Sequence, residues 1–271
     1  MPLLNSRITA PDMIECIDNP VARAFSAAAQ SYDSQAVLQR EVGHELLALL
    51  PEQQVGHWLD LGCGTGYFCQ QLQQRFAQAK GTGIDIAPGM LRQARLLRPG
   101  PNYLCGDAAQ LPLPGQSQQL VFSSLALQWC TDFAAVLREA ERVLTPGGVL
   151  AFSSLAEGTL LELNRSWQAT GSGERVNRFR SLDRYRQLCA ASGMQLLVLE
   201  CRPRVQHYPD VRAVTRHLRQ IGAQHLQHGE RPGLLGRTAY QRLLARYEQL
   251  RQPAGLPVTW QVVYAVLRKT K

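Results

Sequence analysis

The hydrophobic pattern changes in kind along the chain, from helical spacing near the N-terminus to short apolar runs in the middle. From Pro20 to Leu50, apolar residues recur three and four positions apart, as on one face of a helix, and Pro51 ends this region. Five apolar runs then predict strands: Val55–Leu61, Gly81–Ile86, Asn102–Cys105, Leu120–Leu125 and Val149–Ser154. Helical spacing returns between them, at Tyr67–Gln78, Pro88–Leu97 and Phe133–Leu144. Strands that alternate with helices predict a parallel sheet with right-handed crossovers.

The last third of the chain breaks this alternation. Gln195–Val205 and Val258–Leu267 both have the pattern of strands, but the residues between them are mostly helical, and Gly229–Gly233 predicts a turn within that region. A second insertion is expected at about 155–180. We therefore expect a helical lid (1–52), a Rossmann-like core (53–205 and 258–271) and a helical insertion (206–257).

The overall composition is that of a globular protein. The chain has 271 residues, of which 45% are hydrophobic and 18% charged. No apolar run is long enough to predict a membrane span, and the first twenty residues lack the pattern of a secretory signal. The seven cysteines are odd in number and lack CxxC spacing, which favours a reducing cytoplasm over a disulfide framework or a zinc site.

Charge is distributed unevenly around a net value of +8. Residues 1–154 carry a net charge of −3, whereas residues 155–271 carry +11. A basic half predicts an anionic partner, which can be nucleic acid, acidic lipid or an acidic protein. The alternative is an ordinary solvated surface.

A glycine-lined turn follows the first predicted strand. Residues 58–66 read Trp-Leu-Asp-Leu-Gly-Cys-Gly-Thr-Gly, and glycine at 62, 64 and 66 allows a tight bend with a ligand close to the backbone. The GxGxG spacing differs from the GxGxxG of dehydrogenases. Asp60 lies two residues before the first glycine and suits a cationic ligand, such as an ammonium group, better than a pyrophosphate. The turn contributes four candidate binding residues besides Asp60: Gly62, Cys63, Gly64 and Gly66.

Acidic residues follow at the ends of the next two predicted strands. Asp85 lies 19 residues after Gly66, where a carboxylate can accept hydrogen bonds from both ribose hydroxyls. Asp107, in Gly-Asp-Ala, can accept from an adenine amino group. Met90 is placed either against an adenine face or in the core. Further expected cofactor contacts are Ile86, Ala108 and Ser124.

In combination these motifs resemble those of the class I S-adenosylmethionine-dependent methyltransferases. The resemblance covers about residues 20–155 and includes a Leu-Thr-Pro-Gly-Gly turn at 144–148 before the fifth strand. It implies a Rossmann-like α/β sheet of seven strands with the last pair antiparallel, and S-adenosyl-L-methionine as the methyl donor.

The segment after the fourth strand indicates the methyl acceptor. It lacks the Asn/Asp-Pro-Pro-Tyr/Phe motif that orients an exocyclic amine, and the Pro-Cys of a cytosine methylase. Instead Gln128 and Trp129 offer an amide and an indole N–H, which can hold a carboxylate without supplying a base. A carboxylate is already ionised at neutral pH and needs none. The alternative for both residues is packing at the strand end.

A closer resemblance extends over nearly the whole chain from residue 20. Val21–Asp33 looks like the lid helix of the malonyl-acyl-carrier-protein O-methyltransferases of biotin synthesis, and residues 125–129, 177–179 and 221–226 are also similar. The resemblance implies methylation of the free carboxylate of a malonyl thioester. Tyr32 would close over the methionine end of the cofactor or is a core tyrosine. Arg178 would pair with the malonyl carboxylate or dock a phosphate or protein surface.

The basic half has a place in this family, because acyl carrier proteins are acidic and present a phosphopantetheine arm. The arginines concerned recur at helical spacing, although a solvated helix face is the alternative. They are Arg212, Arg216, Arg219, Arg242 and Arg246.

Other functions remain open at this point. They are an RNA methyltransferase, a methyltransferase for a dicarboxylic acid or quinone precursor, and a cofactor-binding protein without catalysis. His225 and His228 are expected to be surface residues rather than metal ligands.

Overall fold

The fold is built on one mixed sheet. The structure is a computed structural model that describes residues 19–168, 177–221 and 237–271. Within these residues the sheet has seven strands in the order β3-β2-β1-β4-β5-β7-β6. The strands are β1 (His57–Leu61), β2 (Lys80–Asp85), β3 (Asn102–Cys105), β4 (Gln118–Ser124), β5 (Leu144–Leu155), β6 (Gln195–Tyr208) and β7 (Leu256–Arg268). The first five run parallel, whereas β7 is antiparallel to both β5 and β6, which confirms the predicted fold class.

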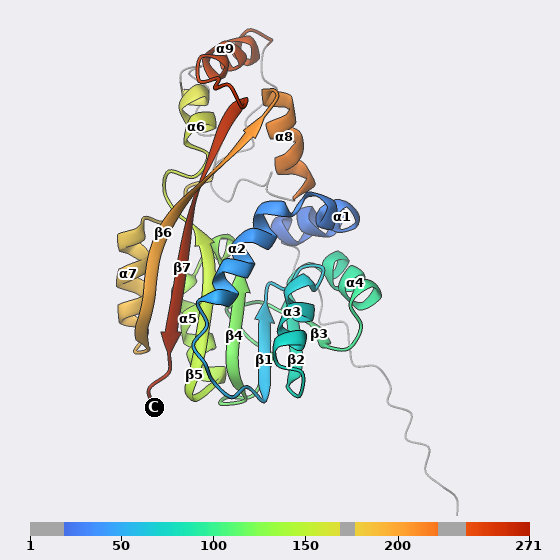
Figure 1. The fold of residues 1–271 in the computed structure, drawn as a ribbon, viewed down its shortest axis with the longest axis vertical. Coiled ribbons are helices and arrows are strands. Elements are labelled where there is room, and N and C mark those ends of the chain that lie inside the picture. The colour runs from blue at the N-terminus through green and yellow to red at the C-terminus, as the bar shows by residue number, and fades with distance from the viewer. Residues whose placement is uncertain (1–18, 169–176, 222–236) are drawn as a thin grey trace, which may run out of the picture.

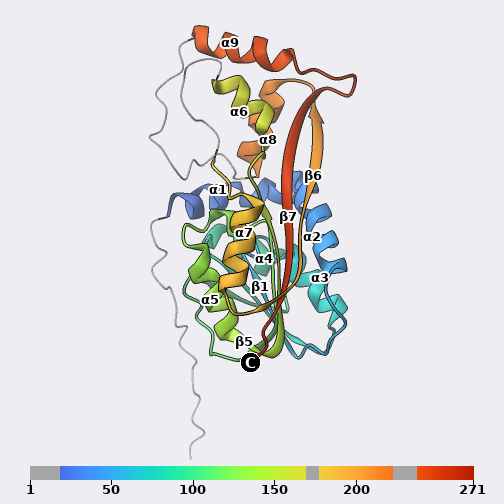
Figure 2. The same ribbon diagram turned by 90° about the vertical axis from the view of Figure 1, so that its left-hand side faces the viewer.

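Helices cover both faces of the sheet. Figure 2 shows α2 and α3 on one face, and α5 and α7 on the other. The helices are α1 (Pro20–Gln35), α2 (Val37–Ala48), α3 (Tyr67–Arg75), α4 (Pro88–Leu97), α5 (Phe133–Val143), α6 (Leu161–Gln168), α7 (Leu182–Ala191), α8 (Val211–Gln220) and α9 (Arg237–Glu248), with a 3-10 turn η1 (Leu127–Trp129). None of the described helices is long and apolar enough to cross a membrane.

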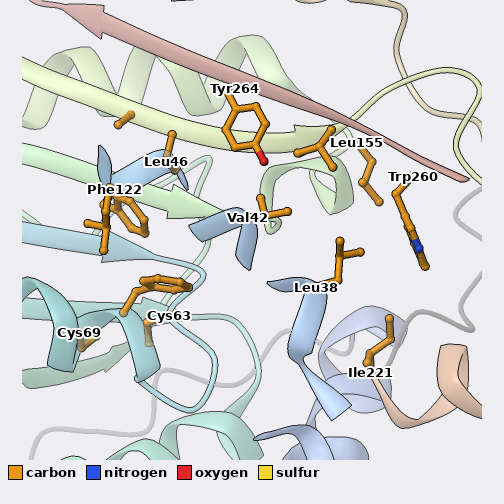
Figure 3. Close-up of a cluster of buried hydrophobic side chains, with 14 of the residues drawn as sticks. Leu38, Val42, Leu46, Cys63, Cys69, Phe122, Leu155, Ile221, Trp260 and Tyr264 are labelled. Atoms are coloured by element: carbon orange, nitrogen blue, oxygen red, sulfur yellow. The ribbon is translucent and has the colours of Figure 1, made fainter. Parts of the chain in front are cut away.

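The alternation of side chains along the strands divides the core into two layers. Trp58 and Phe122 lie in the layer beneath α2 and α3, whereas Leu59 and Val121 lie in the layer beneath α5. All four are completely buried. Figure 3 shows part of the first layer, where Phe122 lies near Leu46 of α2. Burial of this kind stabilises by about 25 cal/mol per Å² of apolar surface removed from water.

Helix α1 lies across the carboxyl ends of the parallel strands (Figure 1). Its first residue is Pro20, and the Asn19 side chain accepts a 2.8 Å hydrogen bond from the Val21 amide, so the start of the helix is capped. The single helical region expected from Pro20 to Leu50 is divided at Ala36, after which α2 returns along the sheet. Helix α1 also packs against α4 and α8.

Strands β6 and β7 extend beyond the rest of the sheet. Their pairing runs from Gln195 opposite Arg268 to Tyr208 opposite Leu256, whereas the β5–β7 pairing ends at Leu155 opposite Val262. The projecting ends lie beside α6, α8 and α9 (Figure 1). In the sequence, helices α8 and α9 come between β6 and β7, where helices were expected. The division of the chain into lid, core and insertion stays a prediction.

Residues 144–148 differ from the expected turn. The structure includes them in β5, because Leu144 already pairs with Gln118. The next paired residues are Val149 and Leu120, so residues 145–148 bulge from the ladder. Gly147 has a φ of +80° there, which favours glycine. The predictions for residues 1–18, for 222–226, for His225 and His228, and for the turn at 229–233 lie outside the described residues.

Candidate active site

The main cavity lies where the parallel strands end and α1 crosses them. It has a volume of about 300 Å³, and is lined by residues that follow β1, β2, β3 and β4 and by residues of α1. This volume is at the lower end of what small-molecule sites occupy. The predicted site residues that line it are Tyr32, Gly62, Gly64, Asp85, Ile86, Met90, Asp107, Ala108, Ser124 and Trp129.

The glycine turn forms the floor of the cavity. The amides of Gly62 and Cys63 both donate to the Ile84 carbonyl, at 2.7 and 3.0 Å, and so tie the turn to β2. Gly62 has a φ of +74°, and an added Cβ would lie 2.2 Å from the Cβ of Ala126. At Gly64, with a φ of +54°, an added Cβ would meet no protein atom within 4 Å and would occupy space next to the cavity. Glycine there leaves room for a ligand against the backbone.

Asp85 connects the turn to the following helix. One of its carboxylate oxygens accepts from the Gly64 amide at 2.8 Å, and the other accepts from the Ala87 amide at 2.8 Å. Burial raises the pKa of Asp85, although these backbone hydrogen bonds oppose the rise. Because each oxygen has a second lone pair, the carboxylate can still accept hydrogen bonds from the hydroxyls of a ligand.

Two further predicted residues line the same cavity. Asp107 accepts a 2.9 Å hydrogen bond from the Ala109 amide, which fixes the loop after β3. Met90 is 1% exposed and packs with Ala22, Ala29 and Ala87, so it belongs to a small core and also lines the cavity. The two interpretations of Met90 are therefore compatible.

Three residues of the glycine motif lie outside the cavity lining. Asp60 is 2% exposed and accepts a hydrogen bond from the Cys69 thiol at 3.3 Å, and burial raises its pKa to about 7. It shares a strand face with Trp58, and its side chain is directed toward α3. Burial also raises the pKa of Cys63 to about 11. Gly66 is the N-cap residue of α3 and has a φ of +81°.

Tyr32 lines the larger cavity from helix α1. Burial raises the pKa of its phenol well above the usual value, and the nearby carboxylates of Asp85 and Asp33 add to the rise. The phenol therefore stays protonated at neutral pH. Phe25, on the same helix, contacts the Trp129 ring edge to face at a centroid distance of 5.5 Å.

A polar latch, which the sequence did not predict, joins the lid helix to the glycine turn. The Thr65 hydroxyl donates to Asp33 at 2.5 Å, and the Arg98 guanidinium donates to the same carboxylate at 2.6 Å. Arg98 also donates to the Thr65 carbonyl at 2.8 Å. Its three residues come from α1, from the glycine turn and from the end of α4. In the sequence, the only indication of a role for Asp33 was its position next to Tyr32.

A smaller cavity of about 30 Å³ adjoins the first. The two share four lining residues: Phe25, Tyr32, Leu125 and Trp129. Gln128 lines the smaller cavity rather than the larger one. Its amide nitrogen donates to the Leu125 carbonyl at 2.6 Å, and its amide oxygen accepts from the Ser154 hydroxyl at 3.4 Å. The side chain is therefore held in place beside the smaller cavity.

Arg178 is exposed and lines neither cavity. Arg180, two residues later, donates to the carbonyls of Cys130 and Thr131 at 2.6 and 3.2 Å. Its guanidinium also lies 5.1 Å from the centroid of the Phe133 ring. Because Cys130 and Thr131 line the larger cavity, Arg180 supports its wall. Sequence reasoning missed this residue, since nothing in the pattern distinguishes it from Arg178.

The electrostatics of the larger cavity favour a cationic ligand. Its described lining includes the carboxylates of Asp85, Asp107 and Asp132, and contains no lysine, arginine or histidine. Across residues 19–168, 177–221 and 237–271, no group of three or more histidine, cysteine, aspartate or glutamate side chains could hold a metal ion. The larger cavity can therefore accommodate a positively charged ligand.

Comparisons with known proteins agree with this geometry. Residues 59–152 match the methyltransferase domain family. The chain is 42% identical over 247 residues to the malonyl-acyl-carrier-protein O-methyltransferase of Serratia marcescens, covering 91% of this chain and 94% of the relative. It is 41% identical over 251 residues to the biotin biosynthesis bifunctional protein BioHC of Cellvibrio japonicus, covering 92% of this chain and 50% of that protein.

A solved structure shows a similar fold. It is a methyltransferase in complex with the Trm112 methyltransferase activator of Haloferax volcanii. That chain superimposes with a TM-score of 0.60 at 20% identity, and the match covers 93% of this chain and 98% of the other. At this identity the likeness supports the fold alone.

Proposed function

Because the chain belongs to the malonyl-acyl-carrier-protein O-methyltransferase family, we propose that it methylates the free carboxylate of a malonyl thioester carried by an acyl carrier protein. The product, a methyl ester, would enter biotin synthesis. The observation that carries this proposal is a pair of adjoining cavities. The larger cavity has carboxylates and no basic side chain in its described lining. The smaller cavity adjoins it, and the two share Tyr32 and Trp129 as lining residues.

The larger cavity fits S-adenosyl-L-methionine. When bound, this cofactor supplies an electrophilic methyl group on a sulfonium. The open space at Gly64 accommodates it against the backbone, and Asp85 would accept from the ribose hydroxyls. Asp107 and Met90 would contact the adenine, with Ile86 and Ala108 beside it and Ser124 at the end of β4. Asp60, Cys63 and Gly66 lie outside the cavity lining and would maintain the conformation of the turn.

The chain itself has little acid–base chemistry to perform. A malonyl carboxylate is ionised at neutral pH, so no residue has to remove a proton from it. What the residues supply is alignment and exclusion of water: Tyr32 and Phe25 cover the site from α1, and Trp129 and Gln128 bound it from η1. Alignment of two reactants can lower the activation barrier by about 7–11 kcal/mol.

The carrier protein would dock on α8 and α9. Arg212, Arg216 and Arg219 are exposed on α8, and Arg242 and Arg246 are exposed on α9. Helix α8 packs against the lid helix, so a carrier held there would deliver its arm beside the smaller cavity. An acidic carrier and a basic helix face attract each other and increase the rate of association. Of the two roles predicted for Arg178, we propose docking of the carrier protein, because its side chain is exposed and lines neither cavity.

The proposal can be tested with purified protein and S-adenosyl-L-methionine. Malonyl-carrier protein, malonyl-coenzyme A and free malonate are supplied separately, and the products are weighed by mass spectrometry. We expect a methyl ester from the carrier-bound acceptor at the lowest acceptor concentration. If none of the three acceptors gains a methyl group while the folded protein binds the cofactor, the proposed substrate is wrong.

A further inference from the structure

One buried polar atom in the smaller cavity lacks a hydrogen-bond partner. It is the amide oxygen Oε1 of Gln39, in the first turn of α2. Gln39 is one of the residues that line this cavity. A buried acceptor without a donor is unfavourable, because it has lost its hydrogen bonds to water and gained none from the protein. Such an atom is a candidate to receive a donor from a ligand.

Most of the other lining residues are apolar. Leu38, Leu155, Ile221 and Trp260 reach the cavity from α2, β5, the end of α8 and β7. Figure 3 shows these four side chains around a common space. The lining is therefore suited to methylene groups, with Gln39 as a polar point among them.

Two other polar side chains of this lining, Trp260 and Gln128, have protein partners. The Trp260 indole N–H donates to the Gln206 side chain at 3.1 Å, and both ends of the Gln128 amide are hydrogen-bonded, to Leu125 and Ser154. Gln39 Oε1 differs from them because it is buried and unpaired. A ligand in this cavity would consequently meet an acceptor at Gln39.

The position of the cavity connects the proposed docking face to the proposed site of methyl transfer. Ile221 caps the end of α8, on which Arg212, Arg216 and Arg219 lie. At its other side the cavity shares Tyr32 and Trp129 with the cofactor cavity. Gln39 therefore lines a cavity that adjoins both the end of α8 and the cofactor cavity.

We propose that Gln39 accepts a hydrogen bond from an amide N–H of the pantetheine arm and so selects acceptors that carry this arm. This inference rests on the proposed function. The pantetheine arm continues from the thioester sulfur through two methylenes to an amide, and then through further methylenes to a second amide. Methylenes match the apolar lining, and an amide N–H is a donor that Gln39 Oε1 lacks. Gln39 is thus a specificity-determining residue.

The test pairs two variants with two acceptors. Gln39→Leu and Gln39→Met remove the amide with little change in size. Gln74→Leu, at an exposed position of α3, is the matched control. Malonyl-coenzyme A carries both amides, whereas the S-ethyl thioester of malonate carries none. For each protein kcat/KM is measured with both acceptors, together with the inhibition constant of pantetheine.

We expect kcat/KM of the Gln39 variants to fall about fivefold to tenfold with malonyl-coenzyme A, the effect of one neutral hydrogen bond, and to change less than about twofold with the ethyl thioester. Inhibition by pantetheine should weaken by the same factor, and Gln74→Leu should resemble the parent. Equal losses with both acceptors, or no loss with either, would overturn the inference. Absence of methyl ester from the parent protein would instead overturn the proposed function, and the affinity of pantetheine for the parent and for the Gln39 variants, measured by calorimetry, would then decide the Gln39 contact separately.

Discussion

The carboxylate of Asp33, near the end of the lid helix, accepts a 2.5 Å hydrogen bond from the hydroxyl of Thr65 in the glycine turn. Arg98 binds the same carboxylate, and the side chains of this ion pair are 13% and 30% exposed. Thr65 is 2% exposed. Helix α1 is therefore attached to the segment that forms the floor of the larger cavity.

Breaking this latch should loosen the lid and weaken cofactor binding. Asp33→Ala removes both hydrogen bonds and leaves Arg98 without its carboxylate. We expect the Kd for S-adenosyl-L-methionine to rise about tenfold, since hydrogen bonds to charged groups contribute about 1.5–3 kcal/mol and only part of this energy is coupled to binding. Calorimetry measures the change. Asp183→Ala, whose side chain is 81% exposed on α7, is the control, and an equal effect there would refute the latch.

Asp85 should be more important for cofactor binding than any other carboxylate of the cavity. Asp85→Ala removes the acceptor for the ribose hydroxyls and also the two hydrogen bonds that hold the amides of Gly64 and Ala87. We expect the Kd for the cofactor to rise about 10- to 100-fold. Unchanged affinity, measured by calorimetry on protein with an unaltered melting temperature, would reject the ribose assignment.

Asp60 should make the stability of the protein without cofactor depend on pH. Burial raises its pKa from 3.8 to about 7, so between these values the folded state keeps a proton that the unfolded state has lost. The free energy of unfolding therefore falls as pH rises from about 4 to 7, by up to about 4 kcal/mol from this group.

Asp60→Asn removes the titration and keeps an oxygen that can accept from the Cys69 thiol. Urea unfolding at pH 5 and pH 7 should show a smaller loss of stability in this variant than in the parent. Asp85, whose pKa is also raised and whose charge adds to the rise at Asp60, leaves part of the pH dependence in the variant. The same pH dependence in both would show that Asp60 is ionised in the folded state.

Arg180 and Arg178 should have different kinetic roles. Arg180→Ala removes the hydrogen bonds to the carbonyls of Cys130 and Thr131, which form part of the cavity wall, and we expect kcat/KM to fall about tenfold with any malonyl acceptor. Arg178→Ala should raise KM for malonyl-carrier protein and leave the kinetics with malonyl-coenzyme A unchanged. If Arg178→Ala abolishes turnover with both acceptors, this arginine contacts the malonyl carboxylate after all.

The arginines of α8 should govern recognition of the carrier and not the chemistry. Arg212→Glu combined with Arg216→Glu reverses the charge of an exposed face. We expect KM for malonyl-carrier protein to rise at least about tenfold at low salt and the difference to shrink as ionic strength increases. The control reverses Arg184 and Arg186, two exposed arginines of α7. Equal effects from the two pairs would indicate a general response to net charge.

Local sequence was sufficient for the parts of the site that depend on one segment of backbone. Gly62, Gly64 and Asp85 were predicted because a strand that ends in glycines places the turn and the following acid at one edge of the sheet. Asp60 differs from them because the pleat of β1 directs its side chain to Cys69 of α3, outside the cavity lining. Proximity to a motif does not decide which face of a strand a residue occupies.

Contacts between distant segments were not accessible from the sequence. Gln39, Arg98 and Arg180 belong to an amphipathic helix, a helix end and a loop, and each has the pattern of an ordinary surface or helix residue. Their surroundings form only in the folded chain, where α1 crosses the strand ends and Arg180 lies beside Cys130 and Thr131. No spacing rule relates such positions, so tertiary structure was required to find them.

The most direct measurement of the central claim follows a labelled methyl group. The purified protein is incubated with S-adenosyl-L-methionine labelled on its methyl carbon and with malonyl-carrier protein, and the acyl arm is released and fragmented in a mass spectrometer. The account predicts that the label lies in an ester on the free malonyl carboxylate. A label on a carbon or nitrogen atom, or no label on the arm of a carrier that binds the protein, would contradict it.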